Sequence, residues 1–312
     1  MITFKKIVSS HNRIKNFIHR TPVLTNYGLD KLTGSQLFCK CENFQKIGAF
    51  KIRGATNAVE QLSSEELDKG VATASSGNHG AALSKAASLR GAKVTVVMPD
   101  NSSSKKVQNV QRNGGQIIWC KPQQESREHV LNNFVEETGA IVIHPYNDER
   151  IIAGQGTVAL ELLEDQPDLD VIITPLSGGG LLSGTLYAAK NINPQIKVYG
   201  AEPEEADDTY RSLKAGKRLA NDTTNTICDG LRAQIGLINF PIIQELVDGI
   251  ITLKEQAIID SMRIIWERMK IIVEPSSAIV LAAVIKKQDM FHNKKVGLIF
   301  SGGNVDLDDL PW

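Results

Sequence analysis

The sequence has little of what marks several special classes of protein. Its 312 residues include only 4 cysteines, whose spacing matches no zinc motif, so a disulfide scaffold is excluded and no zinc site is indicated. No uncharged apolar run approaches the roughly 20 residues that a membrane-spanning helix needs. The 35 basic residues are balanced by 35 acidic ones, so no net field favours a phosphate backbone. We therefore expect neither a membrane span nor a nucleic-acid partner.

The start of the chain also lacks the apolar core of a secretory signal, because charged residues recur every few positions. Free thiols suit a reducing compartment, and we predict that the cysteines are unpaired and buried or half-buried. On an extended segment Cys39 and Cys41 would lie on one face. The sequence thus favours a cytoplasmic location.

What the sequence does contain is the pattern of a two-lobed α/β protein. With 42% hydrophobic residues the composition is that of a globular protein, and at this length two lobes are favoured over one core. Short apolar runs alternate with stretches of helical period, which indicates parallel strands covered on both faces by helices. Residues 70 to about 146 read as one compact unit, and the chain on either side of it as the other lobe. The expected strands are Val71–Ala74, Val94–Met98, Ile117–Trp119, Ile141–Ile143, Val171–Thr174, Val198–Ala201 and Val296–Phe300.

Three loops rich in glycine or serine each follow an expected strand. They are SSGNHG at 75–80, SGGGLLSG at 177–184 and SGGN at 301–304. Backbone N–H groups at a helix start, with glycines that let the chain approach closely, suit an anion such as a phosphate. A tight turn is the alternative for each loop taken singly. The second loop matches neither a dinucleotide fingerprint nor a P-loop, so a single terminal phosphate fits better than a diphosphate.

Lys51 is the fourth element of interest. It stands in GAFKIRGA among small residues and beside Phe50, which indicates a partly desolvated amine with a lowered pKa, as an imine-forming lysine needs. Taken alone, such a lysine is more often a solvated surface residue.

In this order the four elements resemble the fold-type-II pyridoxal-phosphate enzymes, most closely the serine racemase and serine/threonine dehydratase family. The resemblance extends over almost the whole chain, through ENFQKIGAFKIRGA, SSGNHG, SGGGLLSG, AEPEEADD and SGGNVDL. It implies a fold like that of the tryptophan synthase β subunit, with a large cofactor-binding domain from residues 1–68 and 148–312. Residues 69–147 would form a small domain that clamps the substrate. The family also implies a homodimer.

The resemblance implies a role for each matching residue. Lys51 would hold pyridoxal 5'-phosphate and move the α-proton, beside Phe50. Asn78 would contact the phenolic oxygen of the cofactor, and Ser301 its pyridine nitrogen. The phosphate would lie on Gly178, Gly179, Gly180 and Leu181, and the substrate carboxylate on Ser75, Ser76, Asn78 and His79. Glu274 matches an acidic residue near the ring, although a carboxylate at a helix N-terminus would look the same.

Ser76 bears on the type of reaction. Family members that racemise serine carry serine here, whereas threonine deaminases and liver-type serine dehydratases usually carry alanine. A hydroxyl could deliver a proton to the face opposite Lys51, and a helix N-cap is the alternative role. Dehydratases of 3-hydroxyaspartate also carry this hydroxyl. Departures at Ile47, Ala49 and Ser177 leave the substrate preference open.

A second group of candidate ligand residues follows the expected strand at 198–201. In the family this place binds a divalent cation, and the resemblance implies Glu202, Asp208 and the carbonyl of Ala206 as ligands for magnesium, manganese or calcium. A solvated acidic loop is the alternative.

These observations predict a pyridoxal-phosphate enzyme that acts on serine, or on threonine, by racemisation, by elimination of water to give pyruvate and ammonia, or by both. A threo-3-hydroxyaspartate dehydratase is the alternative within the class. A non-catalytic module that binds a small anion on the same fold is the alternative of another class, and retention of Lys51 argues against it.

Overall fold

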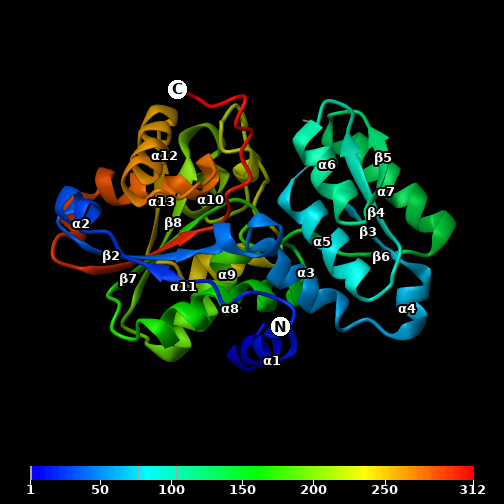
Figure 1. Cartoon of the computed structure of the whole chain (residues 1–312), viewed down its shortest axis with the longest axis horizontal. Helices are drawn as coiled ribbons and strands as arrows, with labels where there is room; N and C mark the ends of the chain where they lie inside the picture. The colour runs from blue at the N-terminus through cyan, green and yellow to red at the C-terminus, as the bar shows by residue number, and fades with distance from the viewer. Residues whose placement is uncertain (1, 76, 103) are drawn as a thin grey trace.

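The protein has two lobes, each built on its own mainly parallel sheet (Figure 1). The computed structural model describes residues 2–75, 77–102 and 104–312. The large lobe holds a six-stranded sheet in the order β1-β2-β10-β7-β8-β9, and the small lobe a four-stranded sheet in the order β5-β4-β3-β6. The strands are β1 (Val23–Leu24), β2 (Gln36–Cys41), β3 (Val71–Ala74), β4 (Val94–Pro99), β5 (Gln116–Cys120), β6 (Ile141–Val142), β7 (Val171–Pro175), β8 (Lys197–Pro203), β9 (Gly249–Leu253) and β10 (Lys295–Phe300).

Helices cover both faces of the large sheet, as the apolar strand runs predict. Along β7 the side chains of Val171 and Ile173 join the core beneath α12 and α13, whereas Ile172 between them joins the core beneath α8, α9 and α11. This alternation is the two-residue period of a strand buried on both sides. The helices are α1 (Phe4–Ile14), α2 (Tyr27–Thr33), α3 (Lys51–Val59), α4 (Ser64–Lys69), α5 (Asn78–Leu89), α6 (Ser104–Arg112), α7 (Gln124–Thr138), α8 (Glu149–Asp165), α9 (Gly180–Ile192), α10 (Asp208–Ala215), α11 (Asn239–Leu246), α12 (Glu255–Met269), α13 (Pro275–Lys286) and α14 (Gln288–Phe291).

All seven strands expected from the sequence are present, and three others were missed. Of these, β1 has only two residues, β9 lies at the sheet edge, and β2 carries a buried charge at Lys40 that interrupts its apolar pattern. Cys39 and Cys41 lie on β2 and contribute to the same core, as expected for an extended segment. All four cysteines are free and buried, which confirms the prediction for the thiols.

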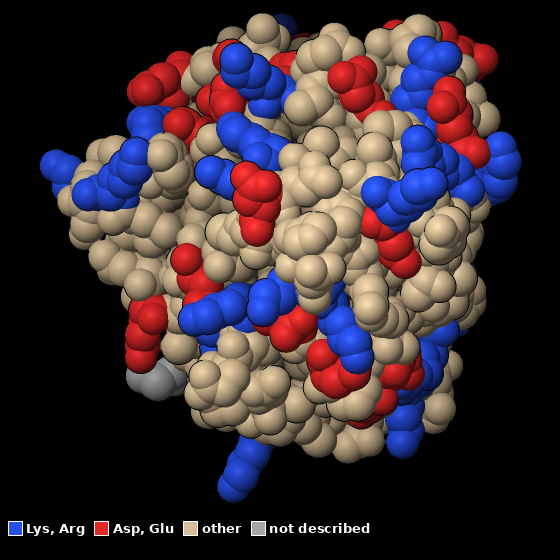
Figure 2. Space-filling view, turned by 90° about the vertical axis from the view of Figure 1, so that its left-hand side faces the viewer, with Lys and Arg blue, Asp and Glu red and all other residues tan. Residues whose placement is uncertain are grey.

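The surface carries charges of both signs. On the face in Figure 2, basic and acidic side chains are interspersed, and no broad field of one sign covers that face. None of the helices in the described part of the chain is both long and apolar enough to cross a membrane.

Candidate active site

The loops after β3 and β10 meet between the lobes. Asn78, the first residue of α5, donates from Nδ2 to the two carboxylate oxygens of Glu274 at 3.0 and 3.2 Å. Its Oδ1 accepts from Nδ2 of Asn304 at 2.8 Å. Because β3 and β10 belong to different sheets, the packing of the two lobes brings these residues of separate motifs together. The sequence motifs contained Asn304 but gave it no role.

Lys51 begins α3 and lies half-buried at this junction. Its Nζ donates to the backbone carbonyl of Pro145 at 2.9 Å and lies 5.3 Å from the centre of the Phe50 ring. Burial lowers the pKa of the amine to about 8, although the nearby Glu274 opposes this shift. A substantial neutral fraction therefore exists near pH 8, as a nucleophilic or basic lysine requires.

The turn before Lys51 holds a strained backbone. Ile47 adopts φ 61° and Gly48 φ 75°, and the former is costly for a β-branched residue. The turn is fixed from the loop after β10, because Asn304 donates to the carbonyl of Ile47 at 2.8 Å and Gly303 to that of Gly48 at 2.9 Å. The backbone that leads into Lys51 is therefore set by the neighbouring loop.

The glycine loop after β7 makes a tight turn into the start of α9, and residues 178–181 of this turn are called the glycine cradle. A Cβ on Gly178 would lie 2.3 Å from the Tyr146 ring, and Gly179 has φ 90°, so neither position accepts a side chain. The first N–H groups of a helix have no partner within it, and they attract anions. The cradle and its donors thus fit a phosphate group at residues 178–181.

Ser301 lies close to Glu274 at the same junction, because a Cβ on the next residue, Gly302, would lie 2.9 Å from Oε1 of Glu274. Ser301 is 4% exposed, and its Oγ lies 3.3 Å from Oγ of Ser277, so a neutral hydroxyl pair occupies this place. Glu274 is buried as well, and burial, with the charge of Asp229, raises the pKa of its carboxyl. Glu274 precedes α13 as its N-cap residue but makes no side-chain cap bond there. Its carboxylate instead accepts from Asn78 and so orients that side chain. The alternative of a carboxylate at a helix N-terminus did not predict this role.

The structure describes Ser75 and His79 in the loop after β3, whereas Ser76 lies outside the described residues. Ser75 Oγ accepts from the backbone of Gly77 and Gly80, at 3.4 and 3.3 Å. His79 is buried and donates from Nε2 to the carbonyl of Ile143 at 3.0 Å. Burial and the charge of Lys51 lower the pKa of His79 to about 3, so the ring is neutral at neutral pH.

The second histidine of interest, His144, is also neutral. Burial, then the charge of Lys51, lowers its pKa to about 4. Nδ1 accepts from the backbone of Asn147 at 2.9 Å, which shapes the loop that presents Pro145 to Lys51. His144 therefore has a structural role here.

Glu202 and Asp208 come together beyond β8. Backbone N–H groups of Thr209 and Tyr210 donate to Glu202 at 3.3 and 3.0 Å, and that of Ile235 donates to Asp208 Oδ2 at 2.8 Å. Burial raises the pKa of Glu202 to about 8 and that of Asp208 to about 6. Asp208 Oδ1 is buried without a hydrogen-bond partner, and within the described ranges no Lys or Arg forms an ion pair with either carboxylate. The donor set and its uncompensated charge fit a divalent cation.

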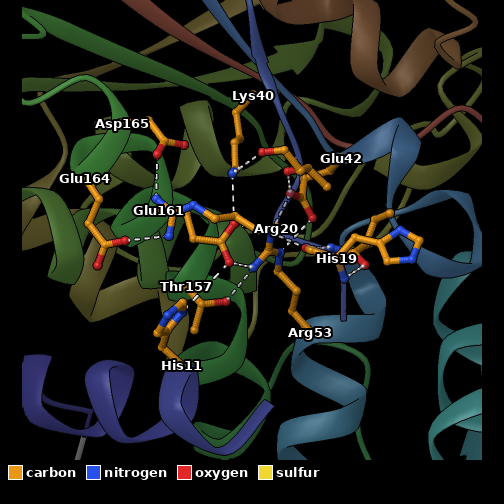
Figure 3. A network of polar contacts seen from close by, with 12 residues as sticks. His11, His19, Arg20, Lys40, Glu42, Arg53, Thr157, Glu161, Glu164 and Asp165 are labelled. Atoms are coloured by element: carbon orange, nitrogen blue, oxygen red, sulfur yellow. Dashed lines mark hydrogen bonds and ion pairs between the residues drawn. The ribbon is translucent and has the colours of Figure 1, made fainter. Parts of the chain in front are cut away.

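A buried ionic cluster was not predicted from the sequence (Figure 3). Its arginine, Arg53, lies on α3, the helix that begins with Lys51. Arg53 of α3 contacts Glu42 at 2.7 Å and Glu161 at 2.8 Å, and Lys40 contacts Glu161 at 2.8 Å. All four side chains are at most 2% exposed. The sequence did contain a signal for this cluster, because charged residues such as Lys40, between two cysteines, stand inside otherwise apolar segments.

The comparisons with known proteins agree with this geometry. The family described as "Pyridoxal-phosphate dependent enzyme" matches residues 14–302. A serine racemase of Oryza sativa is 52% identical over 300 residues, which cover 95% of this chain and 88% of the relative. A beta-hydroxyaspartate dehydratase of Paracoccus denitrificans is 48% identical, with 99% of this chain and 98% of the relative covered.

Among solved structures, that of maize serine racemase superposes with a TM-score of 0.97 at 49% identity, and the match covers 98% of this chain and 95% of the other. Both the sequence and the arrangement of the two lobes therefore place the chain in one family. The chain belongs to the pyridoxal-phosphate dependent enzymes of fold type II, within the family of the serine racemases and their dehydratase relatives.

Proposed function

We propose that the protein uses pyridoxal 5'-phosphate, held by Lys51, to racemise serine, to eliminate water from serine or threonine, or to do both. The observation that carries this proposal is the half-buried amine of Lys51, whose pKa is lowered to about 8 beside the loops at the strand ends. The cofactor, when bound, supplies an electron sink for the charge left at the substrate Cα. The named relatives support the substrate class.

The proposed roles of the residues follow from their places. Lys51 Nζ would take the α-proton from one face, and residues 178–181 would hold the phosphate. One N–H of Asn78 would turn from Glu274 to the phenolic oxygen of the cofactor, and Ser301 would offer a neutral hydroxyl to its pyridine nitrogen. The substrate carboxylate would lie on Ser75, Ser76, Asn78 and His79, in a small clamping domain of residues 69–147 against a cofactor domain of 1–68 and 148–312.

The purified protein should therefore show a visible absorption band that borohydride bleaches. Incubation with L-serine, L-threonine and threo-3-hydroxyaspartate, followed by keto-acid assay and chiral chromatography, tests the function. Turnover confined to hydroxyaspartate would favour the alternative dehydratase, which the Paracoccus relative supports. A protein that binds small anions but carries no reducible cofactor would be a binding module instead.

We expect Ser76→Ala to separate racemisation from elimination. Racemisation needs a proton on the face opposite Lys51, whereas elimination from the L-enantiomer needs only the lysine and a path for the hydroxyl to leave. The variant should lose formation of D-serine from L-serine, and turnover of D-serine, while L-serine still gives pyruvate at a measurable rate. Each enantiomer is incubated separately, and pyruvate is followed beside chiral chromatography. Equal loss of all activities would indicate a carboxylate-binding or N-cap role, and unchanged racemisation would exclude Ser76 as the second acid/base group.

We also propose a structural divalent cation on Glu202, Asp208 and the carbonyl of Ala206. In the described part of the chain, no three His, Cys, Asp or Glu side chains lie close enough together to hold a metal ion. Water would therefore complete the coordination of this cation, as magnesium and calcium allow. A ligand that binds only the folded state raises stability by about 2.7 kcal/mol at 100 times its dissociation constant. Added magnesium, manganese or calcium should raise the melting temperature, and Glu202→Ala should abolish the shift.

The matched control is Glu204→Ala, which removes an exposed carboxylate two positions before Ala206 in the same loop. This variant should leave the metal-induced shift in melting temperature intact. A wild-type melting temperature that responds neither to metal nor to chelator would mean that the carboxylates are held by hydrogen bonds alone.

We also propose a homodimer, which would assemble through exposed apolar side chains. Four large apolar side chains are exposed near α12, and they would be covered in a homodimer: Tyr27, Phe44, Ile272 and Trp312. Arg268 of α12 donates to the carbonyl of Gly28, and Trp266 packs against Trp312. Asn43, the residue before Phe44, donates to the carbonyl of Ile272, so these positions share one region. A cytoplasmic location is supported by the free, buried thiols.

A further inference from the structure

The buried amide of Asn239 joins two loops that border the proposed cofactor site. Asn239, at the start of α11, is fully buried. Its Nδ2 donates to the backbone carbonyl of Tyr146 at 3.0 Å and to that of Gly178 at 2.8 Å. An amide nitrogen carries two hydrogens, so both of its donors are used, one for each loop.

Each carbonyl belongs to a loop with a role in the site. Tyr146 follows Pro145, whose carbonyl accepts from Lys51 Nζ at 2.9 Å. Gly178 begins the glycine cradle at the start of α9. Asn239 therefore links the segment that contacts the lysine to the turn that fits the phosphate.

Packing leaves little freedom around this link. A Cβ on Gly178 would meet the Tyr146 ring at 2.3 Å, and one on Gly179 would meet Cβ of Asn239 at 2.8 Å. The hydroxyl of Ser177 also accepts from the backbone N–H of Ala233 at 3.0 Å, which ties the cradle to the segment before α11. The departure at Ser177 thus has a structural role in this chain.

The oxygen of the Asn239 amide differs from its nitrogen in its hydrogen bonding. Asn239 Oδ1 is buried and has no hydrogen-bond partner in the described part of the chain, which costs stability. A side chain that served stability alone would gain from losing this oxygen. The two donated hydrogen bonds are therefore the feature that needs an explanation.

We propose that Asn239 is a positioning residue that sets the spacing between the glycine cradle and Lys51 before the cofactor binds. This inference rests on the proposed function, in which Lys51 binds the aldehyde carbon and the glycine cradle binds the phosphate of the same molecule. A site whose ends are fixed in advance loses less conformational freedom on binding, so preorganisation appears as affinity. Without the amide, the loops at 146 and 178 lose their common hydrogen-bond donor.

The test is Asn239→Leu, which keeps the size and branching of the side chain and removes the donors. The matched control is Asn57→Leu, because Asn57 is also fully buried and donates to one backbone carbonyl, that of Arg150, at 2.6 Å. Cofactor is titrated into each apoprotein, and melting temperatures are measured with and without cofactor. Loss of two hydrogen bonds should weaken cofactor affinity by about tenfold or more in Asn239→Leu and shrink the cofactor-induced thermal shift.

Asn57→Leu should lower both melting temperatures together and leave the dissociation constant of the cofactor unchanged. The same behaviour in Asn239→Leu would overturn the proposal. Should that variant fail to fold, Asn239→Ser retains one donor, and it should give an intermediate loss of affinity; wild-type affinity there would overturn the proposal equally.

Peptide mapping after borohydride reduction separates this inference from the proposed function. An adduct on Lys51 in the wild type and in both Asn239 variants, with weakened affinity, supports the positioning role. An adduct on another lysine overturns the assignment of Lys51, and the role of Asn239 with it, whereas an unchanged dissociation constant with Lys51 labelled overturns the role of Asn239 alone.

Discussion

Lys51→Ala should lower turnover of L-serine by several orders of magnitude. A positioned general base alone contributes a factor of roughly 10²–10⁴, and loss of the covalent attachment adds to this. The half-buried amine, with its pKa lowered to about 8 by desolvation, suits both tasks. Initial rates of pyruvate formation and of D-serine formation, measured at saturating cofactor, test the prediction.

The control for this substitution is Lys85→Ala, which removes a partly buried lysine from α5 and should retain activity. Reduction with borohydride followed by peptide mapping should place the cofactor adduct on Lys51 in the wild type. Substantial turnover by Lys51→Ala, or an adduct on a different lysine, would refute the assignment.

Arg53→Met should destabilise the folded protein by about 3–5 kcal/mol, because breaking a buried ion pair leaves its partner charges uncompensated. Arg53 donates to both oxygens of Glu42, at 2.7 and 2.8 Å, and to both oxygens of Glu161, each at 2.8 Å. Without it, Glu42 would have no ion-pair partner in the described part of the chain, and Glu161 would keep Lys40 at 2.8 Å. The free energy of unfolding in urea, measured on the apoprotein, gives the size of the effect.

Arg20→Met is the control for this prediction. Arg20 pairs with Glu164 and Asp165 but is 47% exposed, and exposed pairs contribute only about 0–1 kcal/mol. A loss for Arg53→Met that is no larger than the loss for Arg20→Met would show that the buried cluster adds little net stability.

The pH dependence of stability should change in the same variant. Burial opposes ionisation of Glu161, but the hydrogen bonds and charges of Arg53 and Lys40 outweigh it and lower the pKa to about 2. A carboxyl with a lowered folded-state pKa stabilises the protein fully above its ordinary value near 4.5 and loses this contribution as the pH falls toward 2. Unfolding titrations between these values should show a weaker acid dependence in Arg53→Met than in the wild type.

The sequence by itself indicated the α/β class, seven of the strands and the nature of the chemistry. The seven runs from Val71–Ala74 to Val296–Phe300 are mostly apolar and were therefore visible without a structure. Two of them, β5 and β6, lie at the edges of the small sheet and are only partly buried. The loops at 75–80, 177–184 and 301–304 and the lysine at 51 are contiguous motifs, which local sequence carries completely. Their order along the chain was enough to indicate the family that the comparisons show.

Only the tertiary structure decided which groups that are distant along the chain come into contact. Lys51 and Pro145 are 94 residues apart, Arg53 and Glu161 are 108 apart, and Asn78 and Glu274 are 196 apart. A local pattern reports the period of one element, whereas each of these contacts depends on how two elements pack, and burial then sets the pKa of the groups involved. Three features follow from that packing: the neutral histidines, the orientation of Asn78 by Glu274 and the bridge made by Asn239. No run of neighbouring residues encodes them.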